Sequence, residues 1–226
     1  MVTGRLIAAV IGVALAITPG ADLLAQGRIK AAASTTPTPP RSVIQKLRSF
    51  LGLNPPVAIG GSRSGGPLSV CLLSPWPIST RPDSSSTVLV GISQPVLLAA
   101  EPLNEMRLEQ DGRIIWQERA SSTKAIEGPI LWPVKPLQAG EKFTLKIRPR
   151  GASGGDFASY SLQAADSETL ESNKRRIARL GADSAAWFKE IESLSPQQGA
   201  TALALISSPS APAALRETLK CQEKTR

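Results

Sequence analysis

The stretch Met106-Arg-Leu-Glu-Gln-Asp111-Gly112-Arg-Ile-Ile-Trp116 decides the fold of this chain. Apolar residues alternate with charged ones up to Asp111-Gly112, and a second segment rich in apolar residues follows it. Asp-Gly between two such segments predicts a β-hairpin, because a two-residue type I′ turn needs positive φ at both central positions. The two segments are therefore predicted to be neighbouring antiparallel strands.

The period of two continues on both sides of this hairpin, over residues 67–165. Short alternating runs separated by Gly and Pro lie at 88–92, 143–147 and 160–162. Each run has an apolar face and a polar face, which is the pattern of an antiparallel sheet with one wet side. Several short strands at this spacing predict an antiparallel immunoglobulin-like β-sandwich. Glu105 and Glu109, which alternate with Arg107, are predicted to lie on the solvated face.

From residue 166 to 226 the apolar period becomes helical. Asp183 is a good N-cap, and Ser195-Pro196-Gln-Gln198 has the spacing of a capping box with Pro in the first turn. The segment predicts three to four short helices. The fold class is therefore mainly β with an α-helical tail packed on the sandwich.

The N-terminus has the features of a secretory signal. Arg5 precedes an apolar run over residues 6–17, which is followed by Pro19-Gly20 and by Ala25. A run of this length is shorter than the roughly 20 residues that a membrane span needs. We therefore predict a signal peptide over residues 1–25, cut after Ala25. Cleavage after Ala33 and an uncleaved N-terminal anchor are the two alternatives.

Residues 26–66 have the composition of a linker, rich in Ala, Ser, Thr, Pro and Gly. Within it, Ile44, Leu47 and Leu51 recur at helical spacing and predict a short amphipathic helix over residues 42–52. Contact with a membrane surface is its functional interpretation, and the alternative is a docking turn or no stable helix, since the segment is short.

The two cysteines are Cys71 and Cys221. In an oxidising compartment one such pair forms a disulfide or remains as two buried thiols, and the sequence leaves both alternatives open.

The chain holds 26 Lys and Arg against 18 Asp and Glu, a formal net charge of +8. A basic exported protein favours an anionic polymer, a lipid surface or an acidic protein as partner, and nucleic acid is not expected. A solvated basic surface that aids solubility is the alternative. Trp76, which lies between two prolines, is predicted to be a surface anchor. The charged residues predicted to contact a partner are Lys146, Arg148, Arg150, Lys174, Arg175 and Arg176.

The chain contains no histidine. This excludes Ser–His–Asp and Cys–His catalysis, and two cysteines without histidine cannot form a structural zinc site. We predict no catalytic residue, cofactor, metal or small-molecule substrate. The competing hypothesis of a serine hydrolase depends on two motifs, Ser153 in a G-x-S-x-G sequence and Ser121 followed by Lys124 in S-x-x-K.

Three segments together resemble a cyanobacterial exported family, domain of unknown function 928. They are Gly60-Gly-Ser-Arg63 followed by Cys71, Leu137-Gln-Ala-Gly140-Glu-Lys-Phe143-Thr-Leu145, and Ala185-Ala-Trp187-Phe188-Lys-Glu-Ile-Glu-Ser-Leu194. The likeness covers roughly residues 60–207 and implies an exported domain with a sheet followed by helices. The family has no assigned reaction.

The sequence departs from this family at one position that concerns Cys71. The family usually has a second cysteine just after the strand that contains Phe143, where this chain has Arg148-Pro-Arg150. This departure leaves the partner of Cys71 open.

The export signal, the basic charge and the missing catalytic groups together predict an exported, non-enzymatic accessory or interaction module of the cell envelope. The alternatives are a serine hydrolase and a structural subunit of an envelope assembly.

Overall fold

The structure is a computed structural model that describes residues 37–51, 58–61, 67–77 and 87–219. The predicted signal peptide with its cleavage sites, Ala25 and Ala33, lies outside these ranges, and so does Cys221. The statements about them stay predictions.

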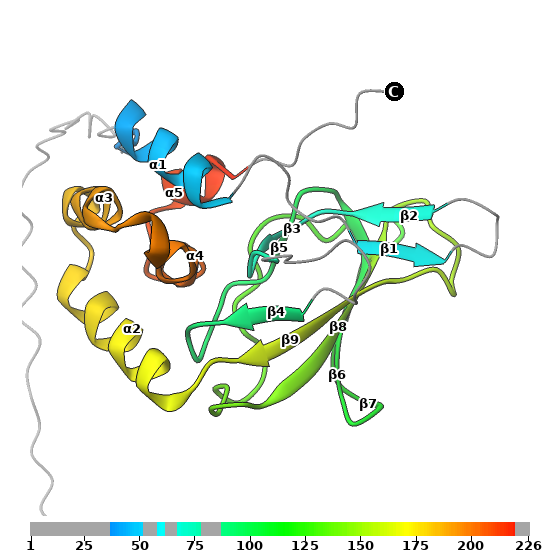
Figure 1. The fold of residues 1–226 in the computed structure, drawn as a ribbon. Helices are drawn as coiled ribbons and strands as arrows, with labels where there is room; N and C mark the ends of the chain where they lie inside the picture. Colours follow the sequence, from blue (N-terminus) through cyan, green and yellow to red (C-terminus); the bar gives the residue numbers. More distant parts are fainter. Residues whose placement is uncertain (1–36, 52–57, 62–66, 78–86, 220–226) are drawn as a thin grey trace, which may run out of the picture. The chain divides into compact units, whose positions relative to one another are not determined.

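A five-stranded sheet forms the main part of the β structure (Figure 1). Its strand order is β4-β9-β8-β6-β7. The strands are β4 (Thr87–Val90), β6 (Leu103–Gln110), β7 (Arg113–Arg119), β8 (Lys142–Pro149) and β9 (Ala158–Ala164). The predicted hairpin is confirmed, because β6 and β7 pair antiparallel and Asp111 and Gly112 have φ values of 50° and 76°.

The sheet is mixed, so the prediction of a purely antiparallel sandwich is wrong in one strand pair. Strands β4 and β9 run parallel, with Val88 opposite Leu162, whereas the other three pairings are antiparallel. Alternation of apolar and polar residues determines which face each side chain occupies, but it contains no information on the direction of the neighbouring strand.

Two small sheets complete the β structure. Strand β1 (Ala58–Gly61) pairs with β2 (Pro67–Val70), and β3 (Leu72–Ser74) pairs with β5 (Leu98–Ala99), both antiparallel. Strand β1 lies inside the predicted linker 26–66, so that segment is not a linker throughout.

The inner face of the five-stranded sheet packs on a first hydrophobic core, the sheet core. Within it the rings of Trp132 and Phe143 meet edge to face at 5.8 Å, and the Tyr160 hydroxyl donates a hydrogen bond to the Val70 carbonyl at 2.5 Å. The half-buried Trp116 packs against its rim. The buried members are Val70, Leu72, Val88, Val90, Leu97, Leu103, Met106, Leu108, Ile126, Trp132, Leu137, Phe143, Leu145, Ile147, Ala158, Tyr160, Leu162 and Ala164.

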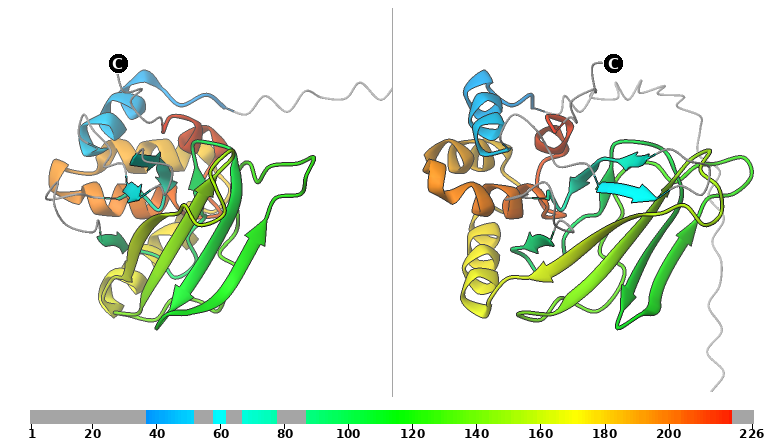
Figure 2. Two further views of the ribbon diagram at one scale, coloured as in Figure 1. Left: turned by 90° about the vertical axis from the view of Figure 1, so that its right-hand side faces the viewer. Right: turned by 45° about the vertical axis from the view of Figure 1, so that its right-hand side comes forward.

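The helices lie together at one end of the sheet and are not a short tail (Figures 1 and 2). They are α1 (Arg41–Leu51), α2 (Ser167–Leu180), α3 (Ser184–Ser193), α4 (Gly199–Ile206) and α5 (Ala213–Glu217), with a 3₁₀ turn at Pro196–Gln198. They enclose a second core, the helix core, in which Trp187 and Ile191 are fully buried. Asp166 and Asp183 cap α2 and α3 by accepting hydrogen bonds from Thr169 N and Ala185 N.

Helix α1 precedes the sheet in sequence but packs on α3 and α4. Its buried residues are Val43 and Leu47, an i, i+4 pair, whereas Ile44 of the predicted face is only partly buried. The apolar face that was predicted to contact a membrane or to dock is therefore used in docking on the helices.

The segment at the junction of β2 and β3, residues 70–73, contributes side chains to both cores. Val70 and Leu72 lie in the sheet core, and Cys71 and Leu73 lie in the helix core. Successive side chains of an extended segment point to opposite sides, so this one segment forms a shared wall between the two cores.

Candidate anion-binding face of the sheet

The outer face of the five-stranded sheet carries a cluster of charged side chains. In strand register, Arg107 of β6 lies opposite Lys146 of β8, and Glu105 of β6 lies between Arg148 of β8 and Arg119 of β7. We call the four basic residues, Arg107, Arg119, Lys146 and Arg148, the cationic face. Glu105 and Glu109 are its two carboxylates.

The two carboxylates hold the basic side chains in place. Arg148 Nη2 donates to Glu105 Oε2 at 2.7 Å, and Arg119 Nε lies 3.9 Å from the same oxygen. Glu109 bridges two cations, with Arg107 Nε at 2.9 Å from Oε1 and Lys146 Nζ at 3.0 Å from Oε2. Two of the cations, one at each carboxylate, reach furthest into solvent: Arg119 is exposed, with 67% of its side chain accessible, and Lys146 is partly exposed, with 30% accessible.

Phe157 supports the two arginines nearest to it. Its ring centroid lies 4.2 Å from Cζ of Arg107 and 5.7 Å from Cζ of Arg148. A guanidinium over an aromatic face is attracted by the ring quadrupole and keeps its N–H groups free for other acceptors. Phe157 thus restricts the orientation of Arg107 and Arg148 without neutralising their charge.

Glu105 is buried, which corrects the prediction of a fully solvated face. Burial by itself raises the pKa of this carboxyl, but hydrogen bonds from Arg148 and Gln117 and the charges of Arg148 and Arg119 outweigh burial and lower the pKa. A carboxylate held ionised in this way is unsuited to act as a general acid at neutral pH.

The cationic face carries a net positive charge. Its four cations and two carboxylates sum to +2. Lys142, also at an outer position of β8, adds one more positive charge beside it.

The structure brings together only two of the predicted contact residues, Lys146 and Arg148. Arg150 is exposed just beyond β8, while Lys174 and Arg175 are exposed on α2. Arg176 of α2 is half-buried and pairs with Glu190 of α3.

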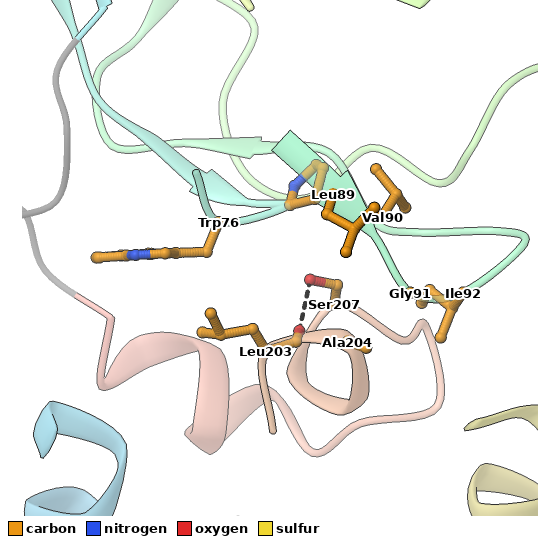
Figure 3. Close-up of a pocket in the computed structure, with 9 residues that line it drawn as sticks. Trp76, Leu89, Val90, Gly91, Ile92, Leu203, Ala204 and Ser207 are labelled. Atoms are coloured by element: carbon orange, nitrogen blue, oxygen red, sulfur yellow. Dashed lines mark hydrogen bonds between the residues drawn. The ribbon is translucent and has the colours of Figure 1, made fainter. Parts of the chain in front are cut away.

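Trp76 is not a surface anchor: it is 4% exposed and lies in the helix core. Figure 3 shows it beside Leu203 at a cavity between the end of β4 and α4. The cavity has a volume of about 10 Å³, room for one water at most. The prolines on either side of Trp76 favour an extended backbone, but the packing of α4 against Trp76 determines its burial.

The serines of the hydrolase hypothesis lie in exposed turns. Ser121 Oγ accepts a hydrogen bond from the backbone N–H of Lys124 at 2.9 Å, which is a turn contact. Ser153 Oγ donates to the carboxylate of the buried Asp156 in the loop between β8 and β9. An exposed loop of this kind lacks the strand–turn–helix context of a nucleophile elbow.

Two kinds of feature are absent from the described ranges. No group of three or more His, Cys, Asp and Glu side chains there could hold a metal ion. No helix in those ranges is long and apolar enough to cross a bilayer.

Sequence reasoning missed Arg107, Arg119, Gln117 and Phe157 as members of this site. The alternation of Arg107 with Glu105 and Glu109 was a signal for Arg107, but the predicted hairpin gave none for Arg119. Its two-residue turn alone would pair Glu105 with Glu118, and a β-bulge at Leu108 and Glu109 brings Arg119 opposite Glu105 instead. No comparable signal exists for Phe157, since its position depends on how the loop after β8 folds back.

No family model and no curated protein matches this chain. Among solved structures, it is similar to one of the fibronectin(III)-like modules of Clostridium thermocellum CbhA. The identity is 14%, the match covers 43% of this chain and 94% of that chain, and the TM-score is 0.24. Structures that differ this much do not define a shared fold.

Proposed function

We propose that this protein is an exported, non-enzymatic interaction module whose cationic face binds an anionic polymer of the cell envelope. The observation that carries the proposal is the arrangement of Arg107, Arg119, Lys146 and Arg148 around only two carboxylates. The predicted signal peptide over residues 1–25 and the resemblance to an exported family support the location. The module is tethered if the signal is retained.

The geometry suits binding rather than catalysis. Side chains already fixed by Glu105, Glu109 and Phe157 lose little conformational freedom when a ligand arrives, which favours affinity. Arg119 and Lys146 are the two more accessible of the four cations and meet the ligand, and Arg107 and Arg148 add to the positive potential behind them. Attraction between such groups and a polyanion weakens as salt is added.

The scaffold supports the same function. We propose that the five-stranded sheet and the two small sheets that share its core form an immunoglobulin-like sandwich, with β4 added in parallel at one edge. A sheet holds its outer side chains at fixed spacings, about 4.8 Å between neighbouring strands. It therefore presents charges to a polymer in a constant pattern.

The test compares two double variants of equal charge. Arg119→Gln with Lys146→Gln removes the two more accessible cations of the face, whereas Lys174→Gln with Arg175→Gln removes two exposed cations of α2. Binding of the full exported chain to immobilised polygalacturonate is measured at 50 and 300 mM NaCl. We expect about tenfold weaker binding at 50 mM for the first variant, since two accessible charge contacts contribute about 0.7 kcal/mol each.

The α2 variant serves as the control and should bind within about twofold of the parent. Equal losses in both variants would mean that total charge, and not this face, determines binding. Absence of binding by the parent at 50 mM NaCl would overturn the proposed function.

A further inference from the structure

A row of hydroxyl groups adjoins the cationic face on the same side of the sheet. Thr87 of β4 lies opposite Ser161 of β9, Ser161 lies opposite Thr144 of β8, and Thr144 lies opposite Glu109 of β6. All three hydroxyl residues alternate with core residues, so their side chains point outward. With strands about 4.8 Å apart, the row extends about 10 Å across the sheet.

These hydroxyls are free to meet a ligand. Thr87 is exposed, and Thr144 and Ser161 are partly exposed. None of the three side chains makes a hydrogen bond to another residue in the described part of the chain. Lys142 and Lys146 flank Thr144 along β8, about 13 Å apart by the rise of a strand.

We infer, on the basis of the proposed function, that the polymer is an acidic polysaccharide that lies across the outer face of the sheet from β9 to β7. Its carboxylates pair with Lys142, Lys146 and Arg119, and its hydroxyls hydrogen-bond to Thr144 and Ser161. Donors and acceptors beside cations match a ligand that has both hydroxyl and acidic groups. A polymer of phosphate alone offers charge but no hydroxyl donor.

The face recognises sugars by hydrogen bonding and charge, because it has no open aromatic platform. Phe157 is in contact with two of the cations, and the guanidinium groups of Arg107 and Arg148 lie against its ring. Stacking on a sugar ring needs an aromatic face that is uncovered.

The experiment separates the two kinds of contact by polymer and by variant. Binding to polygalacturonate and to long-chain polyphosphate is measured at 50 and 300 mM NaCl, because screening at the higher salt weakens the charge contribution. The variant Thr144→Val with Ser161→Ala removes two hydroxyls and keeps residues compatible with a strand. Ser122→Ala with Thr123→Val removes two exposed hydroxyls elsewhere and is the control.

We expect the first variant to bind polygalacturonate about tenfold more weakly, the effect of two neutral hydrogen bonds of usual net strength. Its binding to polyphosphate should change by less than about twofold. Thr144→Ser keeps the hydroxyl and should bind polygalacturonate like the parent. Circular dichroism and the unfolding temperature verify that each variant is folded.

The outcomes distinguish this inference from the proposed function. The hydroxyl variant could bind polygalacturonate like the parent while Arg119→Gln/Lys146→Gln binds it more weakly. That result would overturn the assignment of an acidic polysaccharide as the ligand and would leave a site for polyanions in general. Equal losses for both polymers in the hydroxyl variant would also overturn this assignment. Failure of the parent to bind either polymer at low salt overturns the proposed function itself.

Discussion

Arg148 Nη2 lies 2.7 Å from Glu105 Oε2, and this contact joins β8 to β6 across the outer face of the sheet. The side chain of Glu105 is 5% exposed and that of Arg148 is 17% exposed, so both charges are largely removed from water. A buried charge that loses its partner destabilises the folded state strongly. The pair therefore links the stability of the sheet to the arrangement of its cations.

Replacing Glu105 by Gln should destabilise the protein by about 2 kcal/mol, because Arg148 then lacks a charged partner but keeps some access to water. Urea unfolding at pH 7 measures the change. Glu171→Gln is the matched control, since its ion pair with Lys174 is exposed and should contribute less than about 0.5 kcal/mol. Similar losses in the two variants would contradict the assignment of a buried pair.

The pH dependence of unfolding should show the lowered pKa of Glu105. A carboxyl whose folded-state pKa is lowered adds stability above its unfolded-state pKa of about 4.3, and this stability is lost as the pH falls through the folded-state pKa. We expect the difference in unfolding free energy between the parent and Glu105→Gln to shrink below about pH 4.3. A difference that stays constant between pH 7 and pH 2 would refute this expectation.

Gly91→Ala should destabilise the protein by about 1–3 kcal/mol through overpacking. A Cβ at this position would lie 2.8 Å from Cβ of Ala204 and 3.0 Å from Nδ2 of Asn173, which donates to the Gly91 carbonyl at 2.8 Å. Thermal unfolding measures the effect. Gly154→Ala, at a position with open space around it, is the control and should change the unfolding temperature little.

Leu47→Ala should cost about 2–5 kcal/mol, because Leu47 of α1 is 1% exposed in the helix core. Gln45→Ala, on the exposed side of the same helix, should have almost no effect. Chemical unfolding of both variants compares the two faces of α1. If Leu47→Ala left the free energy of unfolding unchanged, the docking of α1 would not contribute to the stability of the protein.

Cys71 and Cys221 are expected to form a disulfide in an oxidising compartment. Cys71 is 2% exposed in the helix core, and Leu219, two residues before Cys221, is buried in the same core. Peptide mapping without reduction should yield one linked peptide that contains both cysteines. Recovery of both as alkylated thiols from unreduced protein would exclude the bond.

The hairpin of β6 and β7 could be predicted because its signals are local: an alternating pattern and Asp111-Gly112 in the turn. The parallel pairing of β4 with β9 could not, since 67 residues separate Val90 from Ala158 and alternation does not specify a partner. The capping box at Ser195 and Gln198 was also local and is present.

The candidate site was only partly predictable for the same reason. One strand contains Glu105, Arg107 and Glu109, and the alternation of charged and apolar residues predicted their common face. Their burial depends on Arg148 of β8 and on Phe157, which are distant in sequence. The burial of Trp76 could not be predicted, because it depends on α4, which covers Trp76 and is distant from it in sequence.

The shared wall between the two cores affects how the protein unfolds. If Val70 and Leu72 leave the sheet core, Cys71 and Leu73 must leave the helix core with them, since a four-residue segment cannot detach on one side only. The strands and helices should therefore melt in a single cooperative transition, with matching hydrogen-exchange protection in both layers. A fragment cut at residue 165 would expose the side of this segment that carries Cys71 and Leu73, and we expect it to aggregate rather than fold alone.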